Sequence, residues 1–233
     1  MAISVTSIGK TVQTANANTT TITGVTVPSG ALIVLGAADR SLSGTAAASD
    51  SVGNTYTAAV ALSNTTNSIY HTIFYVKNCT ALSSNTITYT HAQASTMAQI
   101  GALYATGVDT SSPLDGAVTA TTNNLTTAAA NNSVTSGTPS VSNELFVTWL
   151  SVRSGNTTIT QDSTNGWTNQ PGLVFPNTAS SSTGAMQYQI NTGTGTKTCA
   201  NTFASQFNAG SIVGFKPSGG TVTTGNFFFM MGM

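Results

Sequence analysis

Apolar residues occur along this chain in short runs separated by clusters of Gly, Asn, Ser and Pro. Short β-rich runs bounded by turn residues predict β-strands. The predicted strands of the first half span residues 21–27, 31–35, 54–57, 69–76, 85–90 and 99–104. Those of the second half span residues 144–152, 166–168, 185–190 and 211–215. Since no stretch of helical length repeats apolar residues at the i, i+3, i+4, i+7 spacing, the pattern predicts an all-β protein.

Three of the predicted strands, 31–35, 69–76 and 144–152, carry apolar residues on both faces. A strand that is covered on both faces has little need to alternate apolar with polar residues. The run 85–90, in contrast, alternates Ile87 and Tyr89 with Thr, as a half-exposed strand does. We therefore expect the strands at 31–35, 69–76 and 144–152 to lie centrally in their sheets.

The strand pattern occurs twice, at a separation of about 113 residues, since 145 minus 32 is 113. The matched residues are Leu32 and Leu145, Arg40 and Arg153, Tyr75 and Tyr188, and Gly101 and Gly214. Each half alone would leave an apolar sheet face uncovered, and packing two sheets face to face removes that problem. We predict a jelly-roll-like β-sandwich of eight to ten strands with an internal pseudo-repeat and an extended C-terminal tail. The single sandwich spans residues 1–217, with halves at about 9–115 and 116–217.

The end of the chain lies outside this repeat. Residues 218–225 (SGGTVTTG) are typical of a flexible linker. Residues 226–233 then form an apolar tail that carries no charge, and such a segment aggregates unless something covers it. The candidate partner-binding residues of the tail are Phe227, Phe228, Phe229, Met230, Met231 and Met233. A strand folding back onto its own sandwich is the alternative, but we favour docking into a neighbouring subunit.

Charge and hydropathy disfavour a nucleic-acid or membrane partner. Charged residues make up 5% of the chain, against about 25% in ordinary soluble domains. The formal net charge is zero and the six Lys and Arg residues are scattered, which disfavours nucleic-acid binding. No run is long enough for a membrane helix, and the N-terminus lacks the pattern of a secretion signal. We expect a protein made in a cytoplasm, with no membrane or nucleic-acid partner.

The residues that could carry chemistry are few and scattered. The acidic residues are Asp39, Asp50, Asp109, Asp115, Glu144 and Asp162, and we expect the aspartates to form turns rather than a catalytic pair. His71 and His91 are interpreted as hydrogen-bonded structural residues, since no metal-ligand spacing occurs. Calcium is disfavoured because the carboxylates stand singly. We therefore expect neither a metal nor another cofactor.

Four other residue groups have two interpretations each. Cys79 and Cys199 are expected to be buried free thiols, with a disulfide as the alternative. Arg40 and Arg153 are expected to be structural residues at strand ends that bond loop carbonyls or Asp39, with an inter-subunit contact as the alternative. The aromatic residues Trp149, Trp167, Tyr56, Tyr70 and Tyr104 are expected in the core. A glycan-stacking platform is their alternative role.

Four short segments of the chain are DSVGNTYT (50–57), YATGVDTSSPLD (104–115), SNEL (142–145) and GFKP (214–217). They resemble pieces of a β-sandwich family that recurs in virion proteins of tailed bacteriophages and in some bacterial surface proteins. The resemblance covers about residues 10–217. It implies a jelly-roll structural or binding module and brings no catalytic motif.

The resulting hypothesis is a non-enzymatic virion protein, a capsid decoration or cement subunit. Its expected partners are copies of itself in a homo-oligomer, with a trimer among the options, and the major capsid protein or another virion protein. A fibre or adhesin module that binds surface glycans is the alternative.

Overall fold

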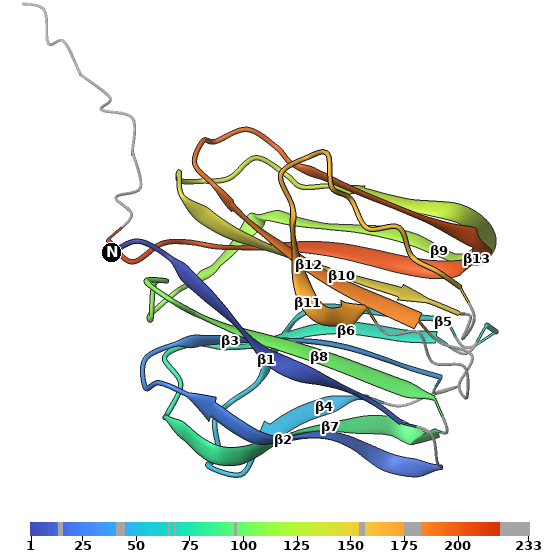
Figure 1. Ribbon diagram of the computed structural model, residues 1–233, viewed down its shortest axis with the longest axis horizontal. Coiled ribbons are helices and arrows are strands. Elements are labelled where there is room, and N and C mark those ends of the chain that lie inside the picture. Colours follow the sequence, from blue (N-terminus) through green and yellow to red (C-terminus); the bar gives the residue numbers. More distant parts are fainter. Residues whose placement is uncertain are drawn as a thin grey trace, which may run out of the picture.

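Two five-stranded antiparallel sheets lie face to face at the centre of the molecule (Figure 1). The computed structural model describes residues 1–13, 16–40, 45–64, 66–67, 69–95, 97–153, 157–174 and 183–219. The first central sheet has the order β1 (Ser4–Val12), β8 (Ala98–Thr106), β3 (Leu32–Asp39), β6 (Ile69–Val76) and β5 (Thr57–Asn64). The second central sheet has the order β9 (Leu114–Thr135), β13 (Thr198–Phe215), β10 (Glu144–Val152), β12 (Thr183–Asn191) and β11 (Thr168–Val174). The predicted all-β class is therefore confirmed.

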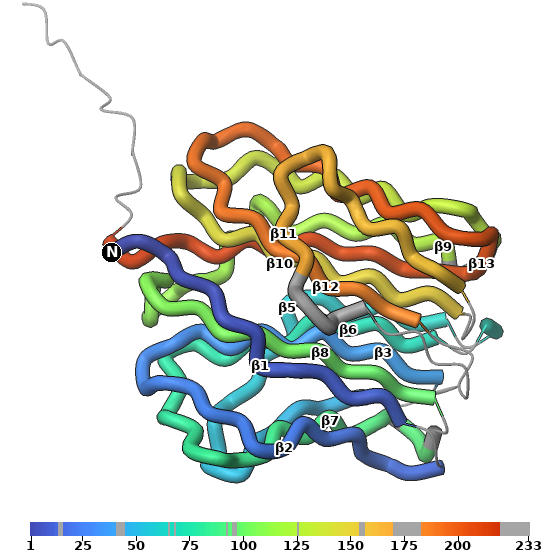
Figure 2. Tube along the Cα trace, viewed as in Figure 1, coloured from blue at the N-terminus to red at the C-terminus, as the bar shows by residue number. Residues whose placement is uncertain are grey.

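Further layers cover the outer faces of these two sheets. A three-stranded outer sheet, with the order β2 (Ala17–Val27), β7 (Leu82–Ser95) and β4 (Ala47–Asp50), covers the first central sheet. On the other side, β9 and β13 are long enough to continue beyond the second central sheet and fold back over it. Val134 and Cys199, from these extensions, pack against Phe146 and Ile212 of the sheet. The described part of the chain thus has thirteen strands in four layers, more than the eight to ten strands expected (Figure 2).

The layering explains why the central strands lack alternation. Every residue of β3 and of β10 is buried. Side chains on one face of β3, such as Val34, join the core between the central sheets, whereas Leu35 on the other face joins the core beneath the outer sheet. A strand placed between two cores needs apolar side chains on both faces. The predicted bounds of β6 and β10 agree with the structure, and those of β3 begin one residue early and end four residues early.

Other strand predictions were wrong at their boundaries or missed an element. Residues 54–56 are not strand, because β5 begins at Thr57, and β11 begins at Thr168 rather than at residue 166. The sequence analysis missed β1, β4, β9 and the first part of β13, whose Thr-, Ser-, Asn- and Ala-rich segments contain few apolar residues.

Corresponding strands occupy the same order in the two central sheets. The order β1-β8-β3-β6-β5 has its counterpart in β9-β13-β10-β12-β11. The pair Ile33↔Val76 becomes Phe146↔Gln189 after a shift of 113 residues, so the β3·β6 and β10·β12 registers agree.

The shift of 113 does not hold for β8 and β13. Gly36 pairs with Gly101, whereas Trp149, which lies 113 residues after Gly36, pairs with Ser211. The structural counterpart of Gly101 is therefore Ser211 and not Gly214. The division of residues 1–217 into halves at about 115 and 116 stays a prediction, and β9 begins close to that point.

Candidate functional site

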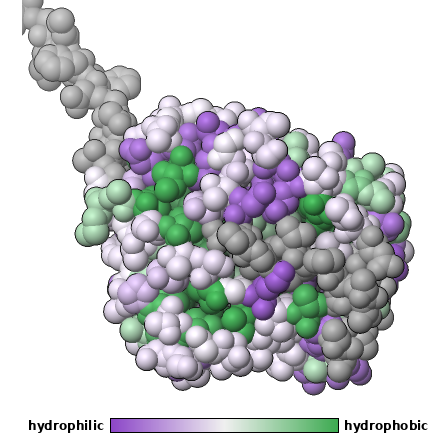
Figure 3. Space-filling view, viewed as in Figure 1, coloured by the Kyte–Doolittle hydropathy of each residue, from purple (hydrophilic) through white to green (hydrophobic). Residues whose placement is uncertain are grey.

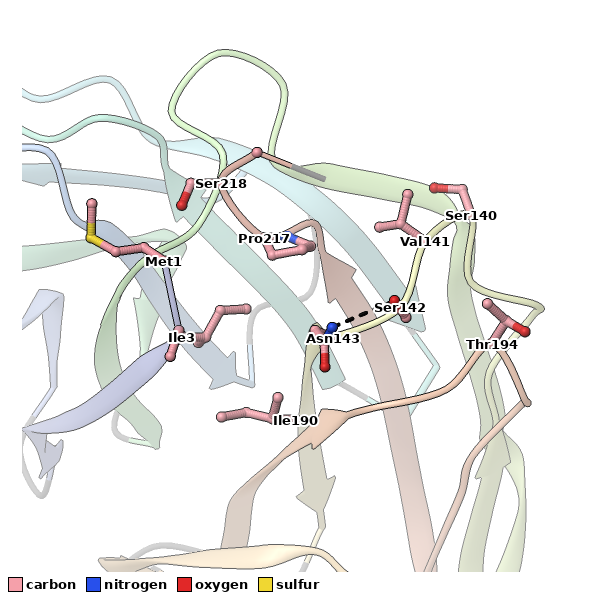
Figure 4. Close-up of a pocket in the computed structure, with 12 residues that line it drawn as sticks. Met1, Ile3, Ser140, Val141, Ser142, Asn143, Ile190, Thr194, Pro217 and Ser218 are labelled. Atoms are coloured by element: carbon pink, nitrogen blue, oxygen red, sulfur yellow. Dashed lines mark hydrogen bonds between the residues drawn. The ribbon is translucent and has the colours of Figure 1, made fainter. Parts of the chain in front are cut away.

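A cavity of about 730 Å³ opens at the end of the molecule where the N-terminus, the start of β10 and the end of β13 meet (Figure 4). This volume falls within the range of about 300 to 1,000 Å³ that is common for ligand sites. The lining residues are Met1, Ala2, Ile3, Ser140, Val141, Ser142, Asn143, Ile190, Thr194, Pro217, Ser218 and Gly219. None of these twelve residues carries a side-chain charge. Ile190, 37% exposed, and Met1, 94% exposed, are unusually accessible for apolar residues.

Close backbone contacts hold the two chain ends together at this cavity. The backbone of Ala2 crosses Gly107, where an added Cβ would lie within van der Waals overlap of the Ala2 carbonyl. Gly107 also has a φ of 76°, a conformation that favours glycine. Its carbonyl accepts a hydrogen bond of 2.8 Å from the Ser218 amide, and Val108 forms a β-bridge with Pro217. These contacts place the first and the last described residues on the same cavity.

Two buried carboxyl groups, Asp115 and Glu144, hold the loop that forms another wall. Oδ2 of Asp115 accepts a hydrogen bond of 2.7 Å from the Ser140 amide, and Oε1 of Glu144 accepts one of 3.2 Å from the Val141 amide. Glu144 is fully buried and Asp115 is 6% exposed. Neither side chain lines the cavity. The pair therefore shapes the wall from behind.

The pKa values of the two carboxyl groups are shifted in opposite directions. Burial, together with the hydrogen bond to Asp115 and its charge, raises the pKa of Glu144 to about 8. Burial acts to raise the pKa of Asp115 as well, but hydrogen bonds from Ser140, Glu144 and Ala117 outweigh it and lower that pKa. Among the described residues, the buried Oε2 of Glu144 has no hydrogen-bond partner. With a pKa of about 8, Glu144 is a neutral acid at pH 7.

The chemistry of this site is suited to binding. The cavity offers apolar side chains, hydroxyl groups and an amide, which match an uncharged or apolar segment better than a charged ligand. The carboxyl pair has the like-charge proximity of a catalytic dyad, but its burial behind the loop separates it from the cavity. The sequence analysis missed this pair, because only the fold brings residues 115 and 144 together. One signal was available: Glu144 begins an otherwise apolar strand.

Three of the remaining aspartates, Asp50, Asp109 and Asp162, form turns and caps, as predicted. Oδ1 of Asp50 accepts hydrogen bonds from the amides of Val52 and Asn54, both 3.1 Å long. Oδ1 of Asp162 does the same for Thr164 and Asn165, at 2.9 and 3.1 Å. Asp109 caps the amides of Ser111 and Ser112, and Asp39 accepts a hydrogen bond from the Tyr89 hydroxyl.

The histidines and cysteines are structural. His71 is fully buried between the central sheets and bonds the hydroxyl groups of Ser151 and Ser211, at 2.7 and 2.8 Å. His91 bonds the Thr20 hydroxyl at 2.8 Å. Both histidines are hydrogen bonded, as predicted. Cys79 and Cys199 are free and buried, which confirms the favoured interpretation.

The aromatic residues follow the prediction of a core role. Trp149 is fully buried and Trp167 is 6% exposed. Tyr56, Tyr70 and Tyr104 are partly buried and pack against the core between the first central sheet and the outer sheet. This burial counts against an aromatic platform for glycans.

The two arginines end equivalent strands, but their partners differ from those expected. Nη1 of Arg40 lies 3.0 Å from the Met97 sulfur, and Nη1 of Arg153 donates to Oδ1 of Asn67 at 3.2 Å. Neither contact involves Asp39 or a loop carbonyl.

Within the described ranges, no group of three or more His, Cys, Asp and Glu side chains is placed to hold a metal ion. The same ranges hold no helix with the length and apolar character that a bilayer crossing requires. The candidate tail residues, from Phe227 to Met233, lie outside the described residues. No protein-family model matches the chain, and no curated protein or solved structure matches it.

Proposed function

We propose that the chain is a non-enzymatic structural protein of a bacteriophage particle, a capsid decoration or cement subunit that stabilises the shell through contacts between subunits. The observation that carries the proposal is the strand order. In the first half, β1 pairs with β8, β2 with β7 and β3 with β6. We interpret this nested pairing, divided between two sheets, as the order of a jelly roll, an architecture common in viral capsid proteins.

The second half supports the same interpretation. Its central sheet repeats the order of the first, and a bridge between Thr160 and Thr202 stands where β4 and β7 pair in the first half. We interpret the chain as two jelly rolls stacked through their larger sheets. Stacking buries a continuous core that includes Leu32, Leu103, Val147 and Phe215, which favours a stiff module over two independently moving ones.

The surface is consistent with a fixed place in an assembly. On the face shown in Figure 3, residues of intermediate hydropathy cover much of the coloured surface, and smaller hydrophobic and hydrophilic patches lie among them. The formal net charge is zero. A protein without net charge lacks the repulsion that keeps freely diffusing proteins apart, so its surface suits permanent neighbours.

The cavity supplies a receptor for the proposed subunit contact. Its uncharged lining matches the uncharged tail at 226–233, and its last lining residue, Gly219, lies seven positions before that tail. Seven residues span at most about 25 Å. A connection of this length allows the tail to extend from its own subunit to a close neighbour. We propose that the tail of one copy enters the cavity of the next, where burying each Phe side chain contributes about 1.5 to 3 kcal/mol before ordering costs.

Deleting residues 226–233 tests the subunit contact. The truncated protein should keep its strand content and cooperative unfolding but lose its oligomeric state in light scattering. Ile190→Gln, a polar change in the cavity of the full-length chain, should weaken oligomerisation in the same direction. As a matched control, Val52→Gln alters an exposed apolar residue outside the cavity and should leave assembly unchanged.

Electron microscopy of particles from the native source tests the wider proposal. Density for the two stacked sheets on the shell would support a decoration role. Its absence from purified particles would refute the virion assignment, and normal assembly of the truncated protein would refute the role of the tail.

A further inference from the structure

A turn in which an aspartate binds an asparagine side chain occurs in both halves of the chain. In the first half, Nδ2 of Asn54 donates a hydrogen bond of 2.8 Å to Oδ2 of Asp50. In the second half, Nδ2 of Asn165 donates one of 2.7 Å to Oδ2 of Asp162. Oδ1 of each aspartate also accepts a hydrogen bond from the backbone amide of its asparagine. The two asparagines therefore occupy equivalent places in two similar turns.

The residue that follows the asparagine differs between the two turns. Asn54 precedes Thr55, whereas Asn165 precedes Gly166, and an Asn-Gly pair occurs once in the sequence. Gly166 has no Cβ and has a φ of 77°, so no side chain of its own covers its backbone nitrogen. Within the described residues, the N–H group of Gly166 donates no hydrogen bond. The nitrogen after Asn165 is thus open, whereas the branched side chain of Thr55 crowds the nitrogen after Asn54.

The side chain of Asn54 is also held more firmly than that of Asn165. Nδ2 of Asn54 donates a second hydrogen bond of 3.2 Å to the Thr80 carbonyl, and Oδ1 accepts one of 2.7 Å from the Thr80 amide. Within the described part of the chain, the side chain of Asn165 has the one hydrogen bond to Asp162. Asn165 and Gly166 are exposed, whereas Asn54 is partly buried. Breaking a single hydrogen bond therefore lets the Asn165 carboxamide rotate in contact with water.

We propose that Asn165 is a site of spontaneous deamidation through a cyclic imide. Hydroxide removes the N–H proton of Gly166, and the nitrogen attacks Cγ of Asn165. The new C–N bond closes the ring while the bond from Cγ to Nδ2 breaks, and Nδ2 leaves as ammonia after taking a proton from water. A water molecule then opens the ring at either carbonyl, which gives aspartate or isoaspartate. The reaction transfers no electrons and needs no enzyme.

The product places a second carboxylate against Asp162. Asp162 is buried, and its Oδ2 also accepts a hydrogen bond of 2.9 Å from the Ala200 amide on β13. A carboxylate at position 165 has no proton to donate and repels the one at 162. The Asn165 carbonyl accepts a hydrogen bond of 3.1 Å from Nε2 of Gln189 on β12. We therefore expect deamidation to loosen the turn from both strands, and this expectation does not depend on the proposed virion role.

Peptide mapping of the full chain by mass spectrometry tests the site, after incubation in mildly alkaline buffer below the unfolding temperature. The peptide that contains Asn165 should convert with time to a mixture of aspartate and isoaspartate, and heavy-oxygen water should label the new carboxyl group. The peptide that contains Asn54 is the internal control and should keep its amide over the same period. Asn165→Gln, whose side chain would have to close a larger ring, should fold normally and stay unmodified.

Asn165→Asp, which carries the charge of the product, measures the consequence separately from the reaction. Its thermal unfolding midpoint should lie about 2 to 4 °C below that of the unaltered protein, and Asn165→Ser, which adds no charge, should lose less. An unchanged midpoint for Asn165→Asp would overturn the loosening of the turn. Retention of the Asn165 amide, conversion of Asn54 at the same rate, or a product without isoaspartate would each overturn the proposed site.

Discussion

Trp149 lies directly over Gly36, the residue that occupies the same position in the first half of the chain. A Cβ at Gly36 would lie 2.5 Å from Cδ2 of Trp149 and 2.9 Å from Cε of Met186. The two positions differ by 113, which is the spacing of the sequence repeat. At the centre of the seam between the two central sheets, one half of the chain therefore supplies a Trp side chain and the other supplies no side chain. This asymmetry lets the two sheets approach each other closely.

Gly36→Ala should consequently destabilise the protein by overpacking. The added methyl group meets the flat indole ring, which is fully buried, so the sheets must shift or Trp149 must leave its position. We expect a loss of about 1 to 3 kcal/mol in the free energy of unfolding, measured by urea denaturation. Gly116→Ala is the matched control, because its added Cβ meets no atom within 4 Å. Equal stabilities of the two variants would contradict this account of the seam.

His71 makes stability depend on pH on the acid side. Burial lowers the pKa of His71 to about 3 from an ordinary value of 6.5. Between these values the unfolded chain binds a proton that the folded protein does not, so stability falls as pH falls from about 6.5 toward 3. The contribution approaches about 1.4 kcal/mol per pH unit. Unfolding free energies measured between pH 4 and 7 should show this slope.

His71→Gln provides the comparison for that slope. The variant keeps a hydrogen-bonding side chain between Ser151 and Ser211 but cannot titrate in this range. His91, whose pKa is also lowered by burial, is present in both proteins, so the difference between their slopes belongs to His71. Identical pH profiles would show that His71 is not the titrating group.

The sequence predicts the centre of this fold better than its outside, for a physical reason. β6 and β10 are predicted with the bounds that they have, because burial between two cores requires apolar residues along both faces. β9 is missed because its outer part exposes Thr, Asn and Ala. These residues are compatible with a strand but produce no apolar pattern from which it could be predicted. Hydrogen bonding to β13 forms this strand, and that partner lies too far along the chain for a local pattern to reveal.

The candidate site shows the same division. Turn formation by Asp50 and Asp162 is readable from the sequence, since each aspartate precedes the amides that it caps. The Asp115 and Glu144 pair is tertiary, because the fold brings β9 and β10 together at these residues. Its identification therefore required the fold.

Asp162 should contribute more to stability than Asp50, although the two form similar turns. Asp162 is 4% exposed, and its Oδ2 accepts hydrogen bonds from the Asn165 side chain and from the Ala200 amide on β13. Asp50 is more exposed, and its Oδ2 accepts a bond of 2.8 Å from the Asn54 side chain. Asp162→Ala should cost about 2 to 4 kcal/mol and Asp50→Ala about 1 to 2 kcal/mol, because buried donors are left unpaired in the first case. Chemical denaturation of both variants checks the order, and a larger loss for Asp50→Ala would reverse it.

Glu144 should make the protein less stable as pH rises from about 4.5 to about 8. Burial and the neighbouring Asp115 raise the pKa of Glu144 from 4.5 to about 8. Between these values the folded protein keeps a proton that the unfolded chain has released, so its stability falls with increasing pH, by up to about 1.4 kcal/mol per unit. Glu144→Gln replaces the neutral acid with a neutral amide and should remove this slope.

The free energy of unfolding of Glu144→Gln should therefore rise relative to that of the unaltered protein as the pH is raised from 5 to 8. The difference between the two proteins should stay constant above pH 8. Hydrogen exchange adds a local measure, because the Val141 amide bonds Oε1 of Glu144 and forms part of the cavity wall. Its protection, corrected for the intrinsic rate, should fall above pH 8 in the unaltered protein and stay constant in Glu144→Gln. Asp115→Asn serves as the contrast, because it weakens the hydrogen bond that Asp115 accepts from the Ser140 amide. This variant should lower the protection of the cavity wall at every pH. A Glu144→Gln profile parallel to that of the unaltered protein would show that the Glu144 proton does not control the wall.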